Sequence, residues 1–406
     1  MRKSKKSVVV LEVHRKAALP VLESMSKGGF HVIGCAPKKL NSGFFSRYCH
    51  ERIVSPSPVS NPKEFKDWLL GFLTSRRIDM LFPVGGGALP VSEIQDDVRK
   101  STLLLTPPHH IFLEGYEKIS TLKAAQSAGV PIPTTWYPHD DDSCIEAVAS
   151  EIRRWPVLVK PSVGSGARGI VWCYTREQLI QRFKEVEQEH GESLVQDFVP
   201  PGRFQYKVDM LVDGHQKLIG EVVYGKTRWY PPMGGSSVLT FSADRPDILA
   251  LAHRTLVQLN WTGFCDFDFV DDPRDGIPKL IEINPRLPES FRMGTSVGVD
   301  FPMMMYRLAC GETVDPVLEY PFNQFLRFLP ADLLWFLRVD SSQRFRTWPS
   351  WFKFWGKDMT YQLSSWNDPG PGIGYMLENI AMMFGRGFWK ERLRTNSGPT
   401  NEKGPT

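Results

Sequence analysis

Two short segments hold most of the residues that could do chemistry. In the first, Lys160 precedes a glycine-rich run in which Gly164, Gly166 and Gly169 are spaced as G-x-G-x-x-G. Backbone N–H groups in such a run can approach phosphate oxygens closely, and the lysine adds a positive charge. The pattern therefore predicts a phosphate-binding loop. The alternative is a plain glycine-rich hairpin with an exposed lysine.

The flanking residues narrow down the kind of glycine loop. Residues 170–175 are β-branched and apolar, whereas a dinucleotide-binding loop opens directly into a helix. The sequence lacks the Gly-Lys-Ser/Thr end of a Walker A loop and the H-R-D and D-F-G motifs of protein kinases. The remaining interpretation is a two-stranded flap with Lys160 on its entering strand.

The second segment is a pair of neighbouring strands that carry oxygen ligands. Alternation places Asp266 and Asp268 on one face of the first strand, and Glu282 and Asn284 on one face of the next. A few hard oxygens that leave room for phosphates and water suit Mg²⁺. Arg286 follows at the strand end, where it can reach an anion beyond the metal. A solvated sheet face with ordinary acidic residues is the alternative.

A basic segment lies between these two. Lys226 and Arg228 precede the Gly-Gly-Ser-Ser run at 234–237. Both cations can pair with a carboxylate, and arginine can do so with two hydrogen bonds. The segment therefore predicts an acceptor site, with a surface loop as the alternative.

The elements that must position these residues fall into three regions. Up to residue 112, strands alternate with helices, which predicts an α/β domain with a parallel sheet covered on both faces. From 113 to 310 the pattern is strand-rich and predicts an α+β unit. Residues 311–394 form an aromatic-rich extension, and the polar residues 395–406 are expected to be disordered.

Individual elements can be expected from periodicity and turn residues. In the first region strands are expected over 8–13, 31–36, 52–56, 79–85 and 102–107, and a helix over 64–77. In the second, helices are expected over 116–130, 176–191 and 246–260, and hairpins over 205–224 and 263–284.

The aromatic extension has two interpretations. Residues 320–360 mix aromatic, aliphatic and basic side chains. The segment could pack its aromatics on the core, or it could lie on an anionic membrane as an interfacial segment.

Composition limits the protein classes that remain. A length of 406 residues indicates two or three domains, and a formal net charge of +4 gives no support for a nucleic-acid partner. No run of 18 uncharged apolar residues occurs, so no spanning helix is expected. The six cysteines are scattered without a C-x-x-C, which favours a reducing, cytoplasmic compartment.

In combination, the lysine–glycine flap and the later E-x-N-P-R resemble the ATP-grasp superfamily. The chain is similar in particular to carboxylate–amine (amino acid) ligases and to the ATP-binding domain of the carbamoyl-phosphate synthase large chain. The resemblance implies a pre-ATP-grasp domain over 1–112 and a two-lobed ATP-grasp fold over 113–310. Its nucleotide lobe would cover about 155–225 and its metal and acceptor lobe about 226–310. The implied cofactors are ATP and Mg²⁺, or Mn²⁺ in its place.

The resemblance also implies roles for single residues. Lys118 and Lys160 would contact the phosphates, and Arg286 would meet the γ-phosphate or the acyl-phosphate. The family's ribose-binding acid is absent from 202–205, which leaves Gln205 as the candidate. The flap would consist of Ser162, Gly164, Ser165, Gly166 and Gly169, the adenine hinge of Gln196, Asp197 and Val199, and the metal site of Asp268, Glu282 and Asn284.

The activity implied is amide-bond formation through an acyl-phosphate, with release of ADP and phosphate. The substrates would be an amine and a small-molecule or glycan-linked carboxylate, with Lys226 and Arg228 in the acceptor site. Two alternatives stay open: an enzyme that makes carbamoyl- or carboxy-phosphate, and a non-catalytic ATP-binding module.

Overall fold

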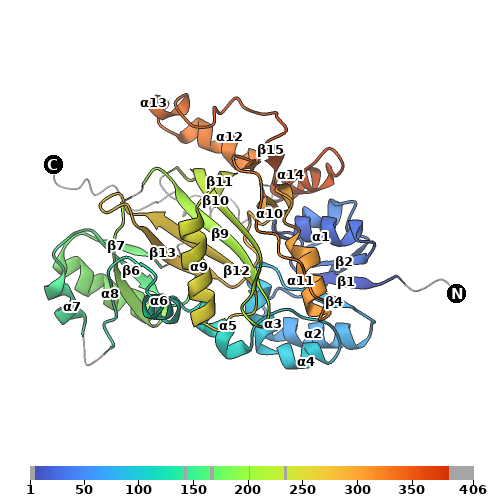
Figure 1. The fold of residues 1–406 in the computed structure, drawn as a ribbon, viewed down its shortest axis with the longest axis horizontal. Coiled ribbons are helices and arrows are strands. Elements are labelled where there is room, and N and C mark those ends of the chain that lie inside the picture. The colour runs from blue at the N-terminus through green and yellow to red at the C-terminus, as the bar shows by residue number, and fades with distance from the viewer. Residues whose placement is uncertain (1–4, 141–143, 165–168, 201, 233–235, 384–406) are drawn as a thin grey trace.

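Three β-sheets organise the protein. The structure, a computed structural model, describes residues 5–140, 144–164, 169–200, 202–232 and 236–383. Within these residues the sheets have four, seven and four strands. Figure 1 shows the N-terminal α/β unit at one side, the large sheet in the middle and the small sheet with its helices at the other side.

The N-terminal sheet is parallel, as predicted, with the strand order β3-β2-β1-β4. Alternate residues of β1 pack on opposite sides: Val8 and Val10 belong to the core with α1, and Val9 to the core with α2. Burial on both faces explains the β-branched run. The elements are β1 Ser7–Val10, α1 Ala18–Lys27, β2 His31–Ala36, β3 Glu51–Val54, α2 Pro62–Thr74, β4 Met80–Phe82, α3 Ala88–Glu93 and α4 Gln95–Arg99.

Two helices lead from this unit into the small sheet. The helix expected over 116–130 is divided at Glu117, whose φ of −88° and ψ of 124° are extended. In the small sheet β6 and β7 pair antiparallel, which confirms the two-stranded flap. The elements are α5 His109–Tyr116, α6 Lys118–Ser127, β5 Thr135–Trp136, α7 Ile145–Glu151, β6 Val157–Pro161, β7 Val171–Cys173, α8 Arg176–His190 and β8 Ser193–Asp197.

The large sheet has the order β13-β12-β9-β10-β11-β14-β15. Helix α9 covers one face, where Phe267 and Phe269 are buried with Ile248 and Leu256. The alternation of β12 then turns Asp266 and Asp268 to the opposite face. The elements are β9 Gln205–Val212, β10 Leu218–Tyr230, β11 Ser236–Ser242, α9 Pro246–Gln258, β12 Gly263–Asp271, β13 Pro278–Asn284, β14 Phe325–Arg327 and β15 Met359–Tyr361.

The C-terminal segment joins the other parts of the protein. Its strands β14 and β15 continue the large sheet, α11 packs against α1, and α12 packs on β10. None of the helices in the described ranges is both long and apolar enough to cross a membrane. The remaining helices are α10 Arg292–Ser296, α11 Phe301–Ala309, α12 Leu329–Arg338, α13 Ser341–Arg344 and α14 Gly370–Met383.

Candidate functional site

A polar pocket of about 290 Å³ forms where the start of α6, the end of β6 and the end of β13 meet. Five of the predicted site residues line it together. They come from three segments of the chain, at residue 118, residue 164 and residues 282–286. These residues are Lys118, Gly164, Glu282, Asn284 and Arg286.

Lys118 ties the flap to this pocket. Its backbone N–H donates to the carbonyl of Ser162, and its Nζ donates to the carbonyl of Gly164, both at 2.9 Å. The same Nζ lies 3.9 Å from Oε2 of Glu282. Burial lowers the pKa of Lys118, with the charge of Glu282 opposing this shift. The break before α6 at Glu117 therefore places a cation between the flap and the acidic strand.

Lys160 is a buried cation that lacks a carboxylate partner. It lies on β6 and is 5% exposed, and its Nζ donates to Oε1 of Gln196 at 2.6 Å. No ion pair to Lys160 occurs within the residues that the structure describes. Burial lowers the pKa of Lys160 to about 8, against the opposing charge of Glu282. An unneutralised buried cation is suited to a polyanionic ligand.

The two aspartates of β12 form a compact charged group with two lysines. Asp266 and Asp268 stand opposite Asn284 and Glu282 in the β12–β13 register. Nζ of Lys207 on β9 lies 2.7 Å from Asp266 and 2.8 Å from Asp268, and Nζ of Lys226 lies 2.5 Å from Asp268. Sequence reasoning did not single out Lys207, although the alternation of β9 places it on the same face as Asp209.

The charges in this group shift one another's pKa values. Burial disfavours the charged form of Lys207, but the attraction of Asp266 and Asp268 outweighs burial and raises its pKa. Burial would raise the pKa of Asp268 as well, but Lys207 and Lys226 hold that pKa below its usual range. For Asp266 burial prevails and raises the pKa to about 7. Asp268 is therefore the firmly ionised member of the pair.

Glu282 is the carboxylate best placed to take a cation. Its side chain is 32% exposed, and among the described residues its nearest cation is Lys118 at 3.9 Å. Asn284 donates its amide N–H groups to both aspartates, at 3.1 and 3.3 Å, and its Oδ1 accepts from Arg286 at 3.3 Å. Arg286 is thereby held at the end of β13.

The oxygen donors of this pocket suit Mg²⁺ that is shared with a phosphate ligand better than a metal ion enclosed by protein side chains alone. The described part of the chain contains no group of three His, Cys, Asp or Glu side chains that could enclose an ion. Mg²⁺ is commonly bound by one or two carboxylates together with substrate phosphates. Glu282 and Asn284 offer oxygens to the pocket, whereas both oxygens of Asp268 are occupied by lysines.

The predicted hinge residues lie along β8 and beyond it. Gln196 donates to Thr135 at 2.9 Å and is fixed by Lys160, so it is not free to read a base with its side chain. Asp197 pairs with Arg274 at 2.8 Å, and Val199 is buried. Gln205 begins β9, where it stands opposite Lys226.

The structure describes only some of the residues predicted to form the flap. Ser162 is buried, and its N–H donates to the carbonyl of Glu192 at 2.8 Å. Gly169 has a φ of +74°, and a Cβ there would lie 2.6 Å from the ring of His190, so glycine is required. Ser165 and Gly166 lie outside the described residues.

Arg228 does not join this site, which corrects its predicted role. It is 1% exposed and lies 2.9 Å from Asp332 of α12, which Arg327 also contacts at 2.6 Å. Burial lowers its pKa to about 10, although Asp332 opposes this shift. Arg228 therefore holds α12 against β10 instead of facing a substrate.

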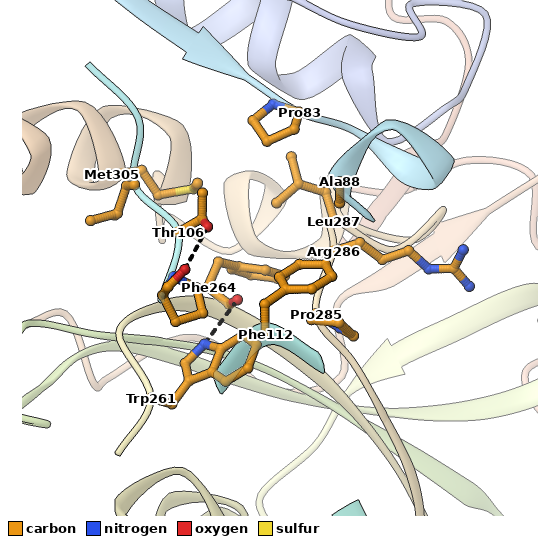
Figure 2. Close-up of a pocket in the computed structure, with 12 residues that line it drawn as sticks. Pro83, Ala88, Thr106, Phe112, Trp261, Phe264, Pro285, Arg286, Leu287 and Met305 are labelled. Carbon is orange, nitrogen blue, oxygen red and sulfur yellow. Dashed lines mark hydrogen bonds between the residues drawn. The ribbon is translucent and has the colours of Figure 1, made fainter. Parts of the chain in front are cut away.

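A second, apolar pocket of about 390 Å³ lies behind Arg286, between the N-terminal sheet and the large sheet. Figure 2 shows Arg286 at its edge, with the guanidinium pointing away from Phe112, Trp261 and Phe264. Pro83 and Ala88 also line it, so both ends of the 83–88 glycine segment reach this space. Between them, the N–H of Gly87 donates to Glu12 at 2.6 Å.

Comparison with known proteins agrees with this geometry. Residues 116–290 match the family model described as an ATP-grasp domain. The carbamoyl phosphate synthase large chain, C-terminal section, of Methanopyrus kandleri is 24% identical over 329 residues, 71% of this chain and 59% of that protein. The D-alanine–D-alanine ligase of Carboxydothermus hydrogenoformans is 24% identical over 182 residues, 41% of this chain and 58% of that protein.

Solved structures show the same fold. A biotin carboxylase–β,γ-ATP complex from Campylobacter jejuni has a TM-score of 0.65 at 19% identity, over 79% of this chain and 74% of that chain. The chain spans about half the length of the curated relatives it matches. These findings confirm the predicted resemblance and the predicted fold class.

Proposed function

We propose that this chain, whose residues 116–290 form an ATP-grasp domain, is an ATP-dependent carboxylate–amine ligase. The observation that carries the proposal is the polar pocket where Lys118, Glu282, Asn284 and Arg286 converge below the flap. Cations on one side and oxygen donors on the other are what a phosphoryl-transfer site requires. The cofactors proposed are ATP and Mg²⁺.

The reaction begins when a substrate carboxylate oxygen attacks the γ-phosphorus of ATP. The bond from the γ-phosphorus to the β,γ-bridging oxygen breaks, ADP leaves, and an acyl-phosphate forms. An amine then attacks the acyl carbon, phosphate leaves with the bonding electrons, and the nitrogen loses a proton. The rate of such a step depends mainly on positioning the reacting groups and on neutralising the phosphate charge.

The residues divide these tasks by their positions. Lys160 and Lys118 hold the phosphates, and Arg286 neutralises the charge that develops on the transferred group. Glu282 and Asn284 would hold Mg²⁺, which neutralises phosphate charge when bound. Lys226, on β10 beside Asp268, is positioned to orient the substrate carboxylate. Asp268 pairs with both Lys207 and Lys226, which fixes the two lysines on the sheet face that carries Glu282 and Asn284.

A second candidate uses bicarbonate as the carboxylate. The sequence similarity to carbamoyl phosphate synthase and to biotin carboxylase favours this second candidate, because the proteins with these names share the ATP-grasp fold. Its product would be carboxy-phosphate or carbamoyl-phosphate. We propose a cytoplasmic reaction in either case, since ATP is the co-substrate and all six cysteines are free thiols.

Trapping with hydroxylamine tests the proposal without knowledge of the amine. The protein would receive Mg-ATP, hydroxylamine and pools of amino acids and sugar acids. An ATP-dependent hydroxamate that disappears in Glu282→Ala would support the ligase. ATP cleavage stimulated by bicarbonate alone, without hydroxamate, would support the second candidate. If neither the substrate pools nor bicarbonate stimulate ATP cleavage, the result would favour the non-catalytic ATP-binding module.

A further inference from the structure

The C-terminal segment carries aromatic side chains of two kinds, and the first kind faces inward. Trp335 of α12 is 7% exposed and belongs to a small core with Val238 and Val339. Trp351 stacks on Phe336 with ring centroids 4.0 Å apart and donates its indole N–H to the carbonyl of Asp332. These contacts attach α12 to the large sheet, so part of the aromatic segment packs on the core.

The second kind is exposed to solvent, and its members are named here the outer aromatic patch. The rings of Phe345 and Phe352 stack 6.2 Å apart and both pack edge-on against Phe336, while Trp351 and Phe354 link Phe352 to Trp355. Contiguous exposed apolar surface of this sort marks an interaction site, unlike scattered single residues. The patch consists of Leu337, Phe345, Phe352 and Trp355, which are 69, 68, 58 and 78% exposed.

Positive charge is concentrated around this patch. Residues 333–358 contain five basic residues and two acidic ones, Asp340 and Asp358, a formal charge of +3, and Asp358 pairs with Lys353. The whole chain has a formal charge of +4, so its other residues together carry only +1. Arg344 lies 5.2 Å from the ring centroid of Phe336, which packs against the patch residues Phe345 and Phe352. The five basic residues are Arg338, Arg344, Arg346, Lys353 and Lys357.

We propose that the outer aromatic patch binds the surface of an anionic lipid bilayer. Exposed Trp, Phe and Leu side chains interleaved with Lys and Arg have the chemistry of an interfacial segment. The basic residues complement anionic headgroups, and the aromatic rings enter the headgroup boundary. The contact is peripheral, because no described helix could span a bilayer. Figure 1 places α12 and α13 at an outer end of the molecule, where a flat surface can reach them.

Co-sedimentation with vesicles tests this proposal on the full chain. Binding to phosphatidylcholine vesicles containing 30% phosphatidylglycerol should exceed binding to pure phosphatidylcholine by at least about tenfold, and should weaken at high salt. Phe352→Ser with Trp355→Ser should reduce binding at least about tenfold. Tyr174→Ser with Val257→Ser changes two similarly exposed apolar residues, one between β7 and α8 and one on α9, and should leave binding unchanged.

Other outcomes would overturn the proposal. These are absence of vesicle binding, equal binding to neutral and anionic vesicles, and equal loss in both double variants. Concentration-dependent association in light scattering that Phe352→Ser with Trp355→Ser abolishes, without vesicle binding, would instead assign the patch to a second copy. Matching thermal midpoints of the two double variants establish that loss of binding is not loss of folding.

Discussion

At the scale of single residues, the site depends on charges that are unequally neutralised. Asp268 is satisfied by Lys207 and Lys226, whereas within the described ranges Glu282 has only a cation at 3.9 Å and Lys160 has only an amide partner. Groups that lack a close partner in the protein are the ones available to a ligand. Glu282 and Lys160 are therefore the residues whose substitution should affect nucleotide chemistry most selectively.

Glu282→Ala should lower the rate of ATP turnover by roughly 10²–10³, because it removes the carboxylate that would hold the Mg²⁺ neutralising the phosphate charge. Its thermal midpoint should stay close to that of the parent chain, since no cation in the described part of the chain lies closer to Glu282 than 3.9 Å. Steady-state kinetics and thermal unfolding check both expectations. Glu64→Gln, an exposed change on α2, is the control. A loss of activity below about threefold would remove Glu282 from the proposed mechanism.

Affinity for Mg-ATP should depend on pH through Lys160. Burial lowers the pKa of Lys160 to about 8, so the lysine carries its full charge well below pH 8 and loses it as the pH rises further. The dissociation constant should therefore be flat at pH 6–7 and rise by up to about tenfold per pH unit above 8. Calorimetric titration measures this directly.

Arginine substitutions separate this effect from general alkaline damage. Lys160→Arg keeps its charge throughout the range and should flatten the profile. Lys184→Arg changes an exposed lysine of α8 and should keep the parent profile. An unchanged dissociation constant of the parent chain between pH 7 and 9.5 would contradict the role given to Lys160.

At the scale of secondary-structure elements, buried polar contacts attach the C-terminal segment to the rest of the protein. One is the ion cluster of Arg228, Arg327 and Asp332, whose side chains are at most 1% exposed. Another is Asp368, which accepts from the hydroxyl of Ser46 at 2.5 Å and from the N–H of Arg47. These contacts lie between segments far apart in the chain.

Asp332→Ala should destabilise the protein by about 3–5 kcal/mol, because two buried guanidinium groups lose their counter-ion. Urea unfolding followed by tryptophan fluorescence would measure the change, since Trp335 and Trp351 lie beside the cluster. Asp67→Ala, on the exposed face of α2, should have little effect. If the two variants unfold at the same urea concentration, the cluster does not fasten α12.

Gly370→Ala should also destabilise the protein, because a Cβ at this position would lie 1.9 Å from the carbonyl oxygen of Phe45. The start of α14 would have to withdraw from the N-terminal unit. Gly71→Ala is the matched control, since no atom lies within 4 Å of the Cβ it would add within α2. Differential scanning calorimetry should show a lower midpoint for Gly370→Ala and an equal or higher midpoint for Gly71→Ala. A similar shift in both would contradict the close approach.

Local pattern was sufficient to predict those parts of the site that lie within one hairpin. Period-two alternation gave the shared faces of Asp266, Asp268, Glu282 and Asn284, because their register is set by one turn. Lys207 was missed since its role depends on β9 lying next to β12, which the sequence order does not reveal. The role predicted for Arg228 was wrong because its partner Asp332 lies 104 residues later.

Element boundaries show the same limit. The helix expected over 116–130 is divided at Glu117, where Lys118 turns toward the flap. The strand expected over 102–107 amounts to a single bridge from Leu103 to Met80. In both cases the periodicity predicted the right type of element, but tertiary contacts changed where the element begins and ends.

At the scale of the whole molecule, the site lies where three sheets come together. The small sheet supplies Lys160, the large sheet supplies Glu282 and Asn284, and the N-terminal unit forms one wall of the apolar pocket behind Arg286. Ion pairs such as Arg15 with Glu289, at 3.2 Å, join the N-terminal unit to the loop after β13. The outer aromatic patch belongs to the C-terminal segment, whose strands continue the large sheet and whose helix α11 packs against α1.

The most direct test of the central claim is phosphorus NMR of the products formed from Mg-ATP by the purified chain, with the carboxylate and amine pools present. The account predicts ADP and inorganic phosphate in equal amounts, at a rate that falls roughly 10²–10³ in Glu282→Ala. AMP with pyrophosphate would contradict phosphoryl transfer to a carboxylate, and so would ADP formation that Glu282→Ala leaves unchanged.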